Sequence, residues 1–164
     1  MAFSPTGTSR GLPGVATPGS YYLGASVYRY VVHVDVLNLY HSTLDAERAT
    51  GRRSRRLDVS ALCRAHLHAL PGRSEARQIV LFSAVAIGSR LLEVVCRDLC
   101  DTVVLVTGDT DLVPAVSAAR RLDANKRLGV LQPYGRANRE LARAVDFALT
   151  IKADTYARHQ FAGA

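Results

Sequence analysis

Two aspartates, Asp109 and Asp111, stand two positions apart in the segment V-T-G-D-T-D at residues 106–111. The apolar run at 103–105 precedes them, and such a run is typical of a buried strand. Gly108 is expected to let the backbone turn tightly after that strand and to leave access to the two acids. This spacing predicts two carboxylates that leave the carboxyl end of one strand together.

A second apolar run, at residues 30–34, leads to Asp35 and then to Asn38 in the same way. Ligand sites in open α/β sheets form beyond the carboxyl ends of the strands, where the direction of winding reverses. Because both runs are expected in one such sheet, Asp35, Asp109 and Asp111 are predicted to converge there. Three converging acids indicate a cation site.

The chemistry of such a cluster favours a hard divalent cation. Neighbouring carboxylates repel each other, and burying them is unfavourable unless a cation or a hydrogen-bond donor compensates. Carboxylate oxygens suit Mg²⁺ or Mn²⁺, with water and a substrate phosphate completing the coordination shell. The hydroxyls of Thr107 and Thr110 are expected to orient the acids, and Asn38 to donate to a phosphate or hold a water. In the purely structural alternative, Asp111 caps the next helix and Asp109 is a turn residue.

His33 lies two positions before Asp35 and therefore on the same face of the predicted strand. That placement is compatible with a metal ligand. A buried core histidine is the favoured interpretation, because a lone histidine on an apolar strand is usually part of the core.

Size and composition indicate a folded globular protein. The chain has 164 residues, which is the size of one ordinary domain, and it lacks an apolar run near the roughly 20 residues that span a bilayer. Residues 1–25, rich in Gly, Ser, Pro and Thr, are predicted to form a flexible tail, and residues 26–164 a single domain. The start of the chain does not resemble a signal peptide, and three cysteines do not suggest a disulfide framework, so we expect a cytoplasmic protein without a membrane partner.

The charge pattern favours a polyanionic partner. The net charge is +7, and arginine, whose planar fork suits phosphate, provides nearly all of the positive charge. A codon bias toward arginine is the alternative explanation. The densest cluster consists of Arg48, Arg52, Arg53, Arg55 and Arg56, and a second set contains Arg120, Arg121, Lys126, Arg127, Arg136, Arg139 and Arg143.

The elements that must position these residues follow a regular β-α alternation. This alternation predicts an α/β fold of three layers, α/β/α, with a mostly parallel sheet of about five strands covered on both faces. The strands are expected at 30–36, 78–82, 102–107, 128–131 and 147–151, and helices at 58–69, 84–99, 111–122 and 137–145. The polar, arginine-rich stretch 41–56 is predicted to be a loop or a short helix.

Two segments resemble the NYN domain family, a PIN-like ribonuclease fold that includes LabA-like proteins. They read V-D-V-L-N-L-Y-H from residue 34 and V-L-V-T-G-D-T-D-L-V-P-A-V from residue 104, and the similarity continues through 126–130, 134–141 and 144–147. The resemblance covers most of residues 30–161. It implies a metal-dependent ribonuclease in which Asp35, Asp109 and Asp111 bind the metal and Asn38 is the accompanying polar residue.

The chain departs from the family pattern at two places. Near residues 82–85 it is shorter, so we expect a strand and a helix of the family pattern to be absent, and Ala84 occupies the position of a further acid. Either Glu93, Asp146 or no residue replaces that acid. Val36 stands where a small residue, often Gly, commonly follows the acid of the first strand, and it is expected to crowd the site.

Our first hypothesis is therefore a divalent-metal-dependent endoribonuclease, with Mg²⁺ or Mn²⁺ as cofactor, that hydrolyses RNA phosphodiester bonds. The expected catalytic residues are Asp35, Asn38, Asp109 and Asp111, and the expected RNA contacts are Thr107, Thr110, Arg136 and Arg139. The alternative is a catalytically weakened relative that binds RNA or a protein partner without turnover. A different D-x-D metal enzyme, such as a nucleotide-sugar transferase, is a third class. A homodimer is compatible with all three.

Overall fold

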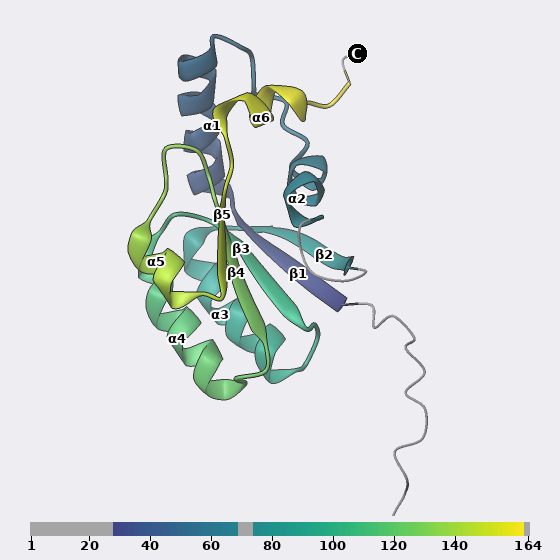
Figure 1. Ribbon diagram of the computed structural model, residues 1–164, viewed down its shortest axis with the longest axis vertical. Coiled ribbons are helices and arrows are strands. Elements are labelled where there is room, and N and C mark those ends of the chain that lie inside the picture. The colour runs from purple at the N-terminus through teal and green to yellow at the C-terminus, as the bar shows by residue number, and fades with distance from the viewer. Residues whose placement is uncertain (1–27, 69–73, 163–164) are drawn as a thin grey trace, which may run out of the picture.

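Five parallel strands form one sheet in the order β2-β1-β3-β4-β5 (Figure 1). The computed structural model describes residues 28–68 and 74–162, so the predicted tail at 1–25 lies outside the described residues. The strands are β1 (Tyr28–Asp35), β2 (Ser74–Phe82), β3 (Thr102–Val106), β4 (Arg127–Gln132) and β5 (Phe147–Thr150). The prediction of a parallel sheet of about five strands is confirmed.

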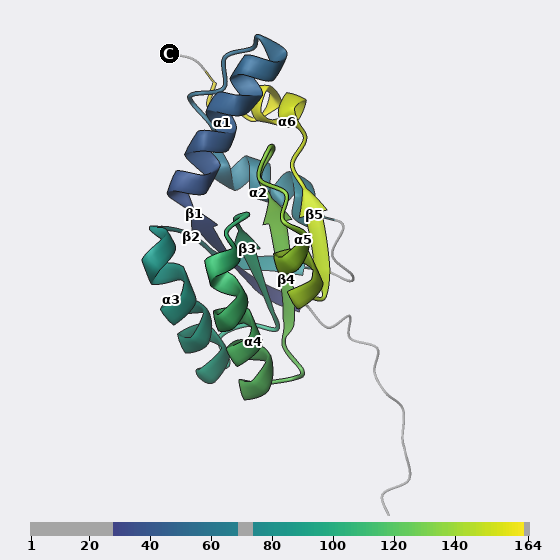
Figure 2. The ribbon, with the colours of Figure 1, turned by 90° about the vertical axis from the view of Figure 1, so that its left-hand side faces the viewer.

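Helices lie on both sides of the sheet. They are α1 (Val36–Thr50), α2 (Val59–Leu67), α3 (Ala84–Cys96), α4 (Val113–Leu122), α5 (Arg139–Ala144) and α6 (Ala153–Arg158), with a 3₁₀ turn, η1 (Thr110–Leu112), before α4. One core joins the sheet to α3, α4 and α5, and includes Ile87 and Leu91. The other core, with Leu62 and Tyr156, joins it to α1, α2 and α6 (Figure 2). The three-layer α/β/α prediction is confirmed.

The prediction of a loop or short helix at 41–56 is wrong over most of its length, because α1 continues to Thr50. The buried positions of α1 are Leu39, Ser42, Thr43 and Ala46, at helical spacing, but two of them are polar, so the apolar periodicity is weak. The helix ends at Gly51, whose φ of 66° is the left-handed conformation that glycine adopts at helix C-termini.

The helix predicted at 84–99 ends three residues early, at Cys96. Asp98 has a φ of 51° and turns the chain back toward β3. Cys100 is consequently buried in the loop before β3, whereas Cys96 is exposed, so the two thiols do not share a helix face.

The sheet order places a switch in winding direction between β1 and β3. The chain crosses from β1 to β2 on one side and then returns to the other side of β1 to form β3. At such a point the loops that leave the two strands separate and open a crevice beyond the carboxyl ends. Asp35 ends β1, and the loop at 107–109 follows β3, so the predicted acids leave the sheet at this switch. Within residues 28–68 and 74–162, no helix has the length and apolar character needed to cross a membrane.

Candidate functional site

A hydrogen bond between Asp35 and Thr107 bridges the two strands at the switch. The carboxylate of Asp35 is 2% exposed; one of its oxygens accepts the backbone N–H of Asn38 at 3.1 Å, and the other accepts the Thr107 hydroxyl at 3.1 Å. Asp35 thereby caps α1 and joins the ends of β1 and β3. Thr107 is fully buried, which favours the role of orienting the acids over direct contact with RNA.

Asn38 connects α1 to the loop that carries the two other acids. Its Oδ1 accepts the backbone N–H of Gly108 at 3.1 Å, while its side-chain N–H groups make no hydrogen bond with the described residues. Gly108 does not have a positive φ, so its backbone conformation does not by itself require glycine. A Cβ atom at Gly108 would lie 1.8 Å from the carbonyl oxygen of Arg136, so the glycine is needed for close approach of the loop after β4.

Asp109 and Asp111 occupy different environments. Asp109 is half-buried; its N–H donates to the Thr107 hydroxyl oxygen at 3.1 Å, and its Oδ1 accepts the N–H of Asp111 at 3.0 Å. The residue that caps the helical turn is therefore Asp109, whereas the purely structural alternative assigned the cap to Asp111. Thr110 and Asp111 are exposed at the edge of the loop. Asp109 Oδ2 has no partner among the described residues.

These side chains match the chemistry of a hydrated divalent cation. In the described part of the chain no three His, Cys, Asp or Glu side chains are grouped closely enough to enclose a metal, so the acids do not form a closed cage. Mg²⁺ commonly binds one or two carboxylates and completes its shell with water and substrate phosphate. The oxygen donors of Asp35 and Asp109 fit that kind of open site, whereas Asp111 is exposed and only its backbone N–H is bonded to Asp109.

Neither Glu93 nor Asp146, the two acids considered as replacements for the further acid of the family pattern, lies at the switch. Ala84 is the first residue of α3 and directly follows the loop after β2, next to β1, but its side chain lies outside the described part of the structure. Glu93 pairs with two arginines on α3 and in the turn that follows it. Asp146 accepts the N–H of Leu128 at the start of β4, at the opposite edge of the sheet.

Arginines lie at the same edge of the sheet as the acids. Arg136 is in the loop after β4, and its guanidinium donates to Asp45 of α1 at 3.0 Å, while 38% of its side chain stays exposed. Arg139 begins α5, is exposed, and has no ion pair with any residue that the structure describes. Asp45, which holds Arg136, is 91 positions away in the chain, and no local pattern pointed to it.

A hydroxyl network fixes the loop after β4 against α1. The Ser42 hydroxyl donates to the carbonyl of Tyr134 at 2.7 Å and lies 2.6 Å from the Tyr156 hydroxyl, which also accepts the N–H of Tyr134 at 3.1 Å. Burial raises the pKa of the Tyr156 hydroxyl above its ordinary value, against the opposing effect of its hydrogen bonds with Ser42 and Tyr134. The sequence contained no signal for this network, because its members come from α1, α6 and a loop.

His33 packs inside the protein as a core residue. Its ring lies edge-on against Phe82 with the ring centroids 5.1 Å apart, and its side chain is 1% exposed. Burial, together with a smaller contribution from the positive charge of Arg90, lowers the pKa of His33 to about 4 from an ordinary value of 6.5.

This histidine is expected to make the protein sensitive to acid. The unfolded state binds the His33 proton at a higher pH than the folded state does, so stability falls as the pH drops from 6.5 toward 4. The loss is about 3 kcal/mol over that window. Urea unfolding of the wild type and of His33→Leu at pH 7 and pH 4 measures it, and equal losses in the two proteins would contradict this assignment.

No protein-family model matches the chain, and no protein of curated function matches it. Among solved structures, the fold is similar to a protein of unknown function from Vibrio parahaemolyticus, with 16% identity, a TM-score of 0.57, and coverage of 78% of this chain and 95% of that chain. A fragment of a putative lipoprotein from Peptoclostridium difficile has 9% identity and a TM-score of 0.40, with 79% and 88% covered. The Vibrio structure shows that the fold occurs in another solved protein.

Proposed function

We propose that this protein is a divalent-metal-dependent endoribonuclease of the NYN type. The observation that carries the proposal is the buried carboxylate of Asp35, joined through Thr107 to the loop of Asp109 and Asp111 at the switch between β1 and β3. The net charge of +7 and the arginines at the same edge support RNA as the substrate.

Each residue has a defined part in this proposal. Asp35 and Asp109 would hold Mg²⁺ or Mn²⁺, with Asp111 on the exposed side, and the bound ion would supply an activated water and neutralise charge on the phosphate. The free N–H groups of Asn38 donate to a phosphate oxygen or to a water. The RNA backbone is held by Thr110, Arg136 and Arg139, through contacts that position the strand without reading its sequence.

The proposal is tested by comparing the wild type and the Asp109→Asn variant in the cleavage of labelled RNA in Mn²⁺. We expect at least a tenfold loss of cleavage and of Mn²⁺ affinity measured by calorimetry, because the amide keeps the cap but removes the charge. Asp123→Asn, at the end of α4 and the opposite edge of the sheet, is the matched control and is expected to behave like the wild type. Undiminished cleavage by Asp109→Asn would reject this site.

A second candidate is a relative that binds RNA without cleaving it. It is favoured by the lack of a closed three-acid group among the described residues and by the position of Ala84 after β2. This candidate predicts RNA binding that weakens with salt, no turnover in Mg²⁺ or Mn²⁺, and no heat of Mn²⁺ binding in the wild type.

A further inference from the structure

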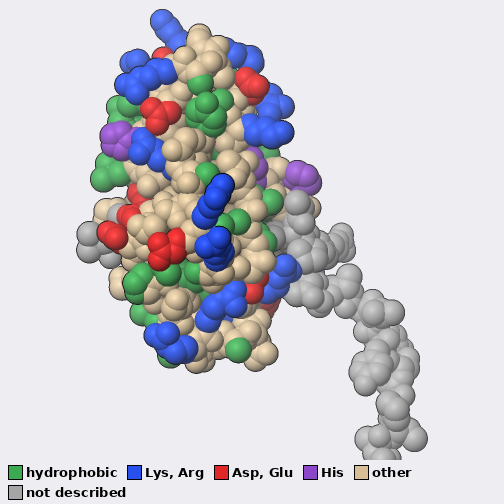
Figure 3. All heavy atoms as spheres, turned by 60° about the vertical axis from the view of Figure 1, so that its left-hand side comes forward, with side chains coloured by type: hydrophobic (Ala, Val, Ile, Leu, Met, Phe, Trp, Pro, Cys, Tyr) green, Lys and Arg blue, Asp and Glu red, His purple; other side chains and the backbone are tan. Residues whose placement is uncertain are grey.

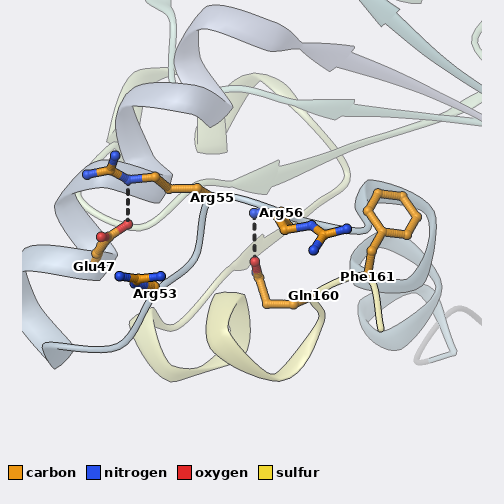
Figure 4. A pocket seen from close by; sticks show the side chains of 6 residues that line it. All are labelled: Glu47, Arg53, Arg55, Arg56, Gln160 and Phe161. Carbon is orange, nitrogen blue, oxygen red and sulfur yellow. Dashed lines mark hydrogen bonds and ion pairs between the residues drawn. The ribbon is translucent and has the colours of Figure 1, made fainter. Parts of the chain in front are cut away.

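A basic cavity lies at the far end of α1 from the candidate metal site. It has a volume of about 620 Å³ and is lined by Glu47, Arg53, Arg55, Arg56, Gln160 and Phe161 (Figure 4). Glu47 comes from the last turns of α1, the arginines from the connection between α1 and α2, and the last two residues from the segment after α6. Two parts of the chain about 100 positions apart thus share one wall.

Backbone pairing holds the arginine segment in place. Leu57 and Gln160 form an isolated antiparallel bridge. Beside it, the N–H of Arg56 donates to Oε1 of Gln160 at 2.8 Å, and the N–H of Phe161 donates to the carbonyl of Arg56 at 2.8 Å. The cavity is therefore built by tertiary pairing, and its arginines project from a supported backbone.

The cavity has an excess of positive charge and an exposed aromatic ring. Arg55 is paired with Glu47 at 3.3 Å, so these two charges compensate each other. The guanidinium groups of Arg53 and Arg56 make no hydrogen bond or ion pair with the described residues. Phe161 is 57% exposed. Guanidinium groups beside an open aromatic face are the combination that proteins use to bind single-stranded nucleic acid, through phosphate contacts and base stacking.

A second cavity shares Arg55 with this one and extends to Val36, next to Asp35 of the candidate metal site. This apolar cavity of about 170 Å³ lies on the side of α1, and its other walls include Tyr40 and Leu81. Val36 directly follows Asp35, and its exposed side chain lines this cavity. Tyr40, 55% exposed, offers a second stacking surface. Figure 3 shows Lys and Arg side chains gathered over the end of the molecule formed by α1 and α6.

We propose that the arginine cavity anchors single-stranded RNA at one end of a track that runs along α1 to the candidate metal site. This inference rests on the proposed function, since it takes RNA as the ligand. The 15 residues of α1 span about 22 Å, which corresponds to about six stacked nucleotides. Single strands are favoured over duplexes because Phe161 and Tyr40 stack only on bases that are not already paired.

The test compares two double charge reversals that lower the net charge equally, from +7 to +3. Arg53→Glu/Arg56→Glu alters the anchor, and Arg121→Glu/Arg143→Glu alters exposed arginines of α4 and α5, on the other side of the sheet. Binding of a fluorescent 12-nucleotide single-stranded RNA is measured by anisotropy in EDTA, so that cleavage does not interfere. We expect at least about a tenfold loss of affinity for the anchor variant and a change of about twofold or less for the control.

The salt dependence gives a second readout. Loss of two phosphate contacts reduces the slope of log affinity against log salt by about 1.4 for a single strand. If both double variants lose RNA affinity equally, the effect comes from net charge alone and the anchor is overturned. Unchanged RNA affinity in the anchor variant would also overturn it. If charge reversal lowers the melting temperature, Arg53→Gln/Arg56→Gln removes the same charges and is judged by the same criteria.

Stacking is tested separately with Phe161→Leu, which keeps an apolar side chain. We expect about a fivefold or greater loss of affinity for the single strand and no change for a 12-base-pair duplex RNA. Equal losses for both RNAs would contradict a single-strand anchor. These assays measure binding without metal, so they are independent of cleavage. If the anchor residues are needed for RNA binding but the protein never cleaves RNA, the nuclease proposal is rejected and the anchor is retained. If the protein cleaves RNA but binds it equally well without the anchor residues, the anchor is rejected and the nuclease proposal is retained.

Discussion

An Asp35→Asn variant is expected to lose Mn²⁺ affinity and RNA cleavage by at least about 100-fold, because the proposed buried metal ligand is lost while the fold is retained. Asparagine caps helices as well as aspartate does, and its amide oxygen still accepts one of the two hydrogen bonds that now come from Asn38 and Thr107. Its side chain has no negative charge to offer a cation. Calorimetric Mn²⁺ titration and cleavage of labelled RNA measure the two losses, and thermal unfolding verifies the fold.

Asp35→Ala separates the proposed metal role of this residue from its structural role. Alanine removes the cap of α1, at a cost of about 0.5–2 kcal/mol, and leaves the buried Thr107 hydroxyl without its acceptor, at a further cost of about 1–3 kcal/mol. We therefore expect the alanine variant to be clearly less stable than the asparagine variant, with equally low Mn²⁺ affinity. Wild-type Mn²⁺ affinity in Asp35→Asn would show that Asp35 is only a helix cap.

The second large effect is expected for Gly108→Ala. The added Cβ would lie 1.8 Å from the carbonyl oxygen of Arg136, so one of the two loops must move and the hydrogen bond from Gly108 to Asn38 is strained or lost. Overpacking of this kind costs about 1–3 kcal/mol or more. Because Asp109 is the next residue, the displacement also moves a proposed metal ligand, and a shift of about 1 Å in a catalytic group lowers the rate about 100-fold.

Gly88→Ala is the matched control for this substitution. A Cβ at Gly88 would lie 3.4 Å from the Cβ of Ala115 and 3.9 Å from Cδ2 of Leu112, both ordinary contacts, and the position lies inside α3. Alanine is favoured over glycine in a helix interior by about 1 kcal/mol, so this variant is expected to be as stable as the wild type or more stable, with unchanged cleavage. Urea unfolding and cleavage rates are compared for both glycine variants. If Gly108→Ala is as stable as the wild type, the loops after β3 and β4 can move apart without cost, and the prediction is wrong.

Much of the fold was predictable because its signals are local. Parallel strands buried on both faces appear as continuous apolar runs, and β1 and β3 were found from such runs together with the strict alternation with helices. The site prediction used the same logic, since acids that end neighbouring parallel strands must leave the sheet at one edge. Asp35 and the 107–109 loop do meet there, through the hydroxyl of Thr107.

The missed helix α1 and the wrong cap residue have physical causes. Helix α1 buries Ser42 and Thr43 among its inward-facing residues, so its hydrophobic periodicity is too weak to detect. Ser42 is buried at no apparent cost because Tyr134 and Tyr156, more than 90 positions away, satisfy its hydroxyl. The residue that caps η1 also depends on backbone geometry that the sequence does not show. Asp109 has the extended conformation that a cap requires, whereas Asp111 lies inside the 3₁₀ turn.

Local sequence patterns specified the chain order of the strands and of helices α2 to α5, the parallel arrangement of the strands, and the delivery of Asp35, Asn38 and Asp109 to one edge of the sheet. These features follow from periodicity and from spacing along the chain, both of which are local. Three features are visible only in the folded chain: Asp45 pairs with Arg136, Gly108 lies against the backbone of the next loop, and the segment after α6 closes the arginine cavity. Those contacts join residues about 30 to 100 positions apart, and packing, not local preference, selects them.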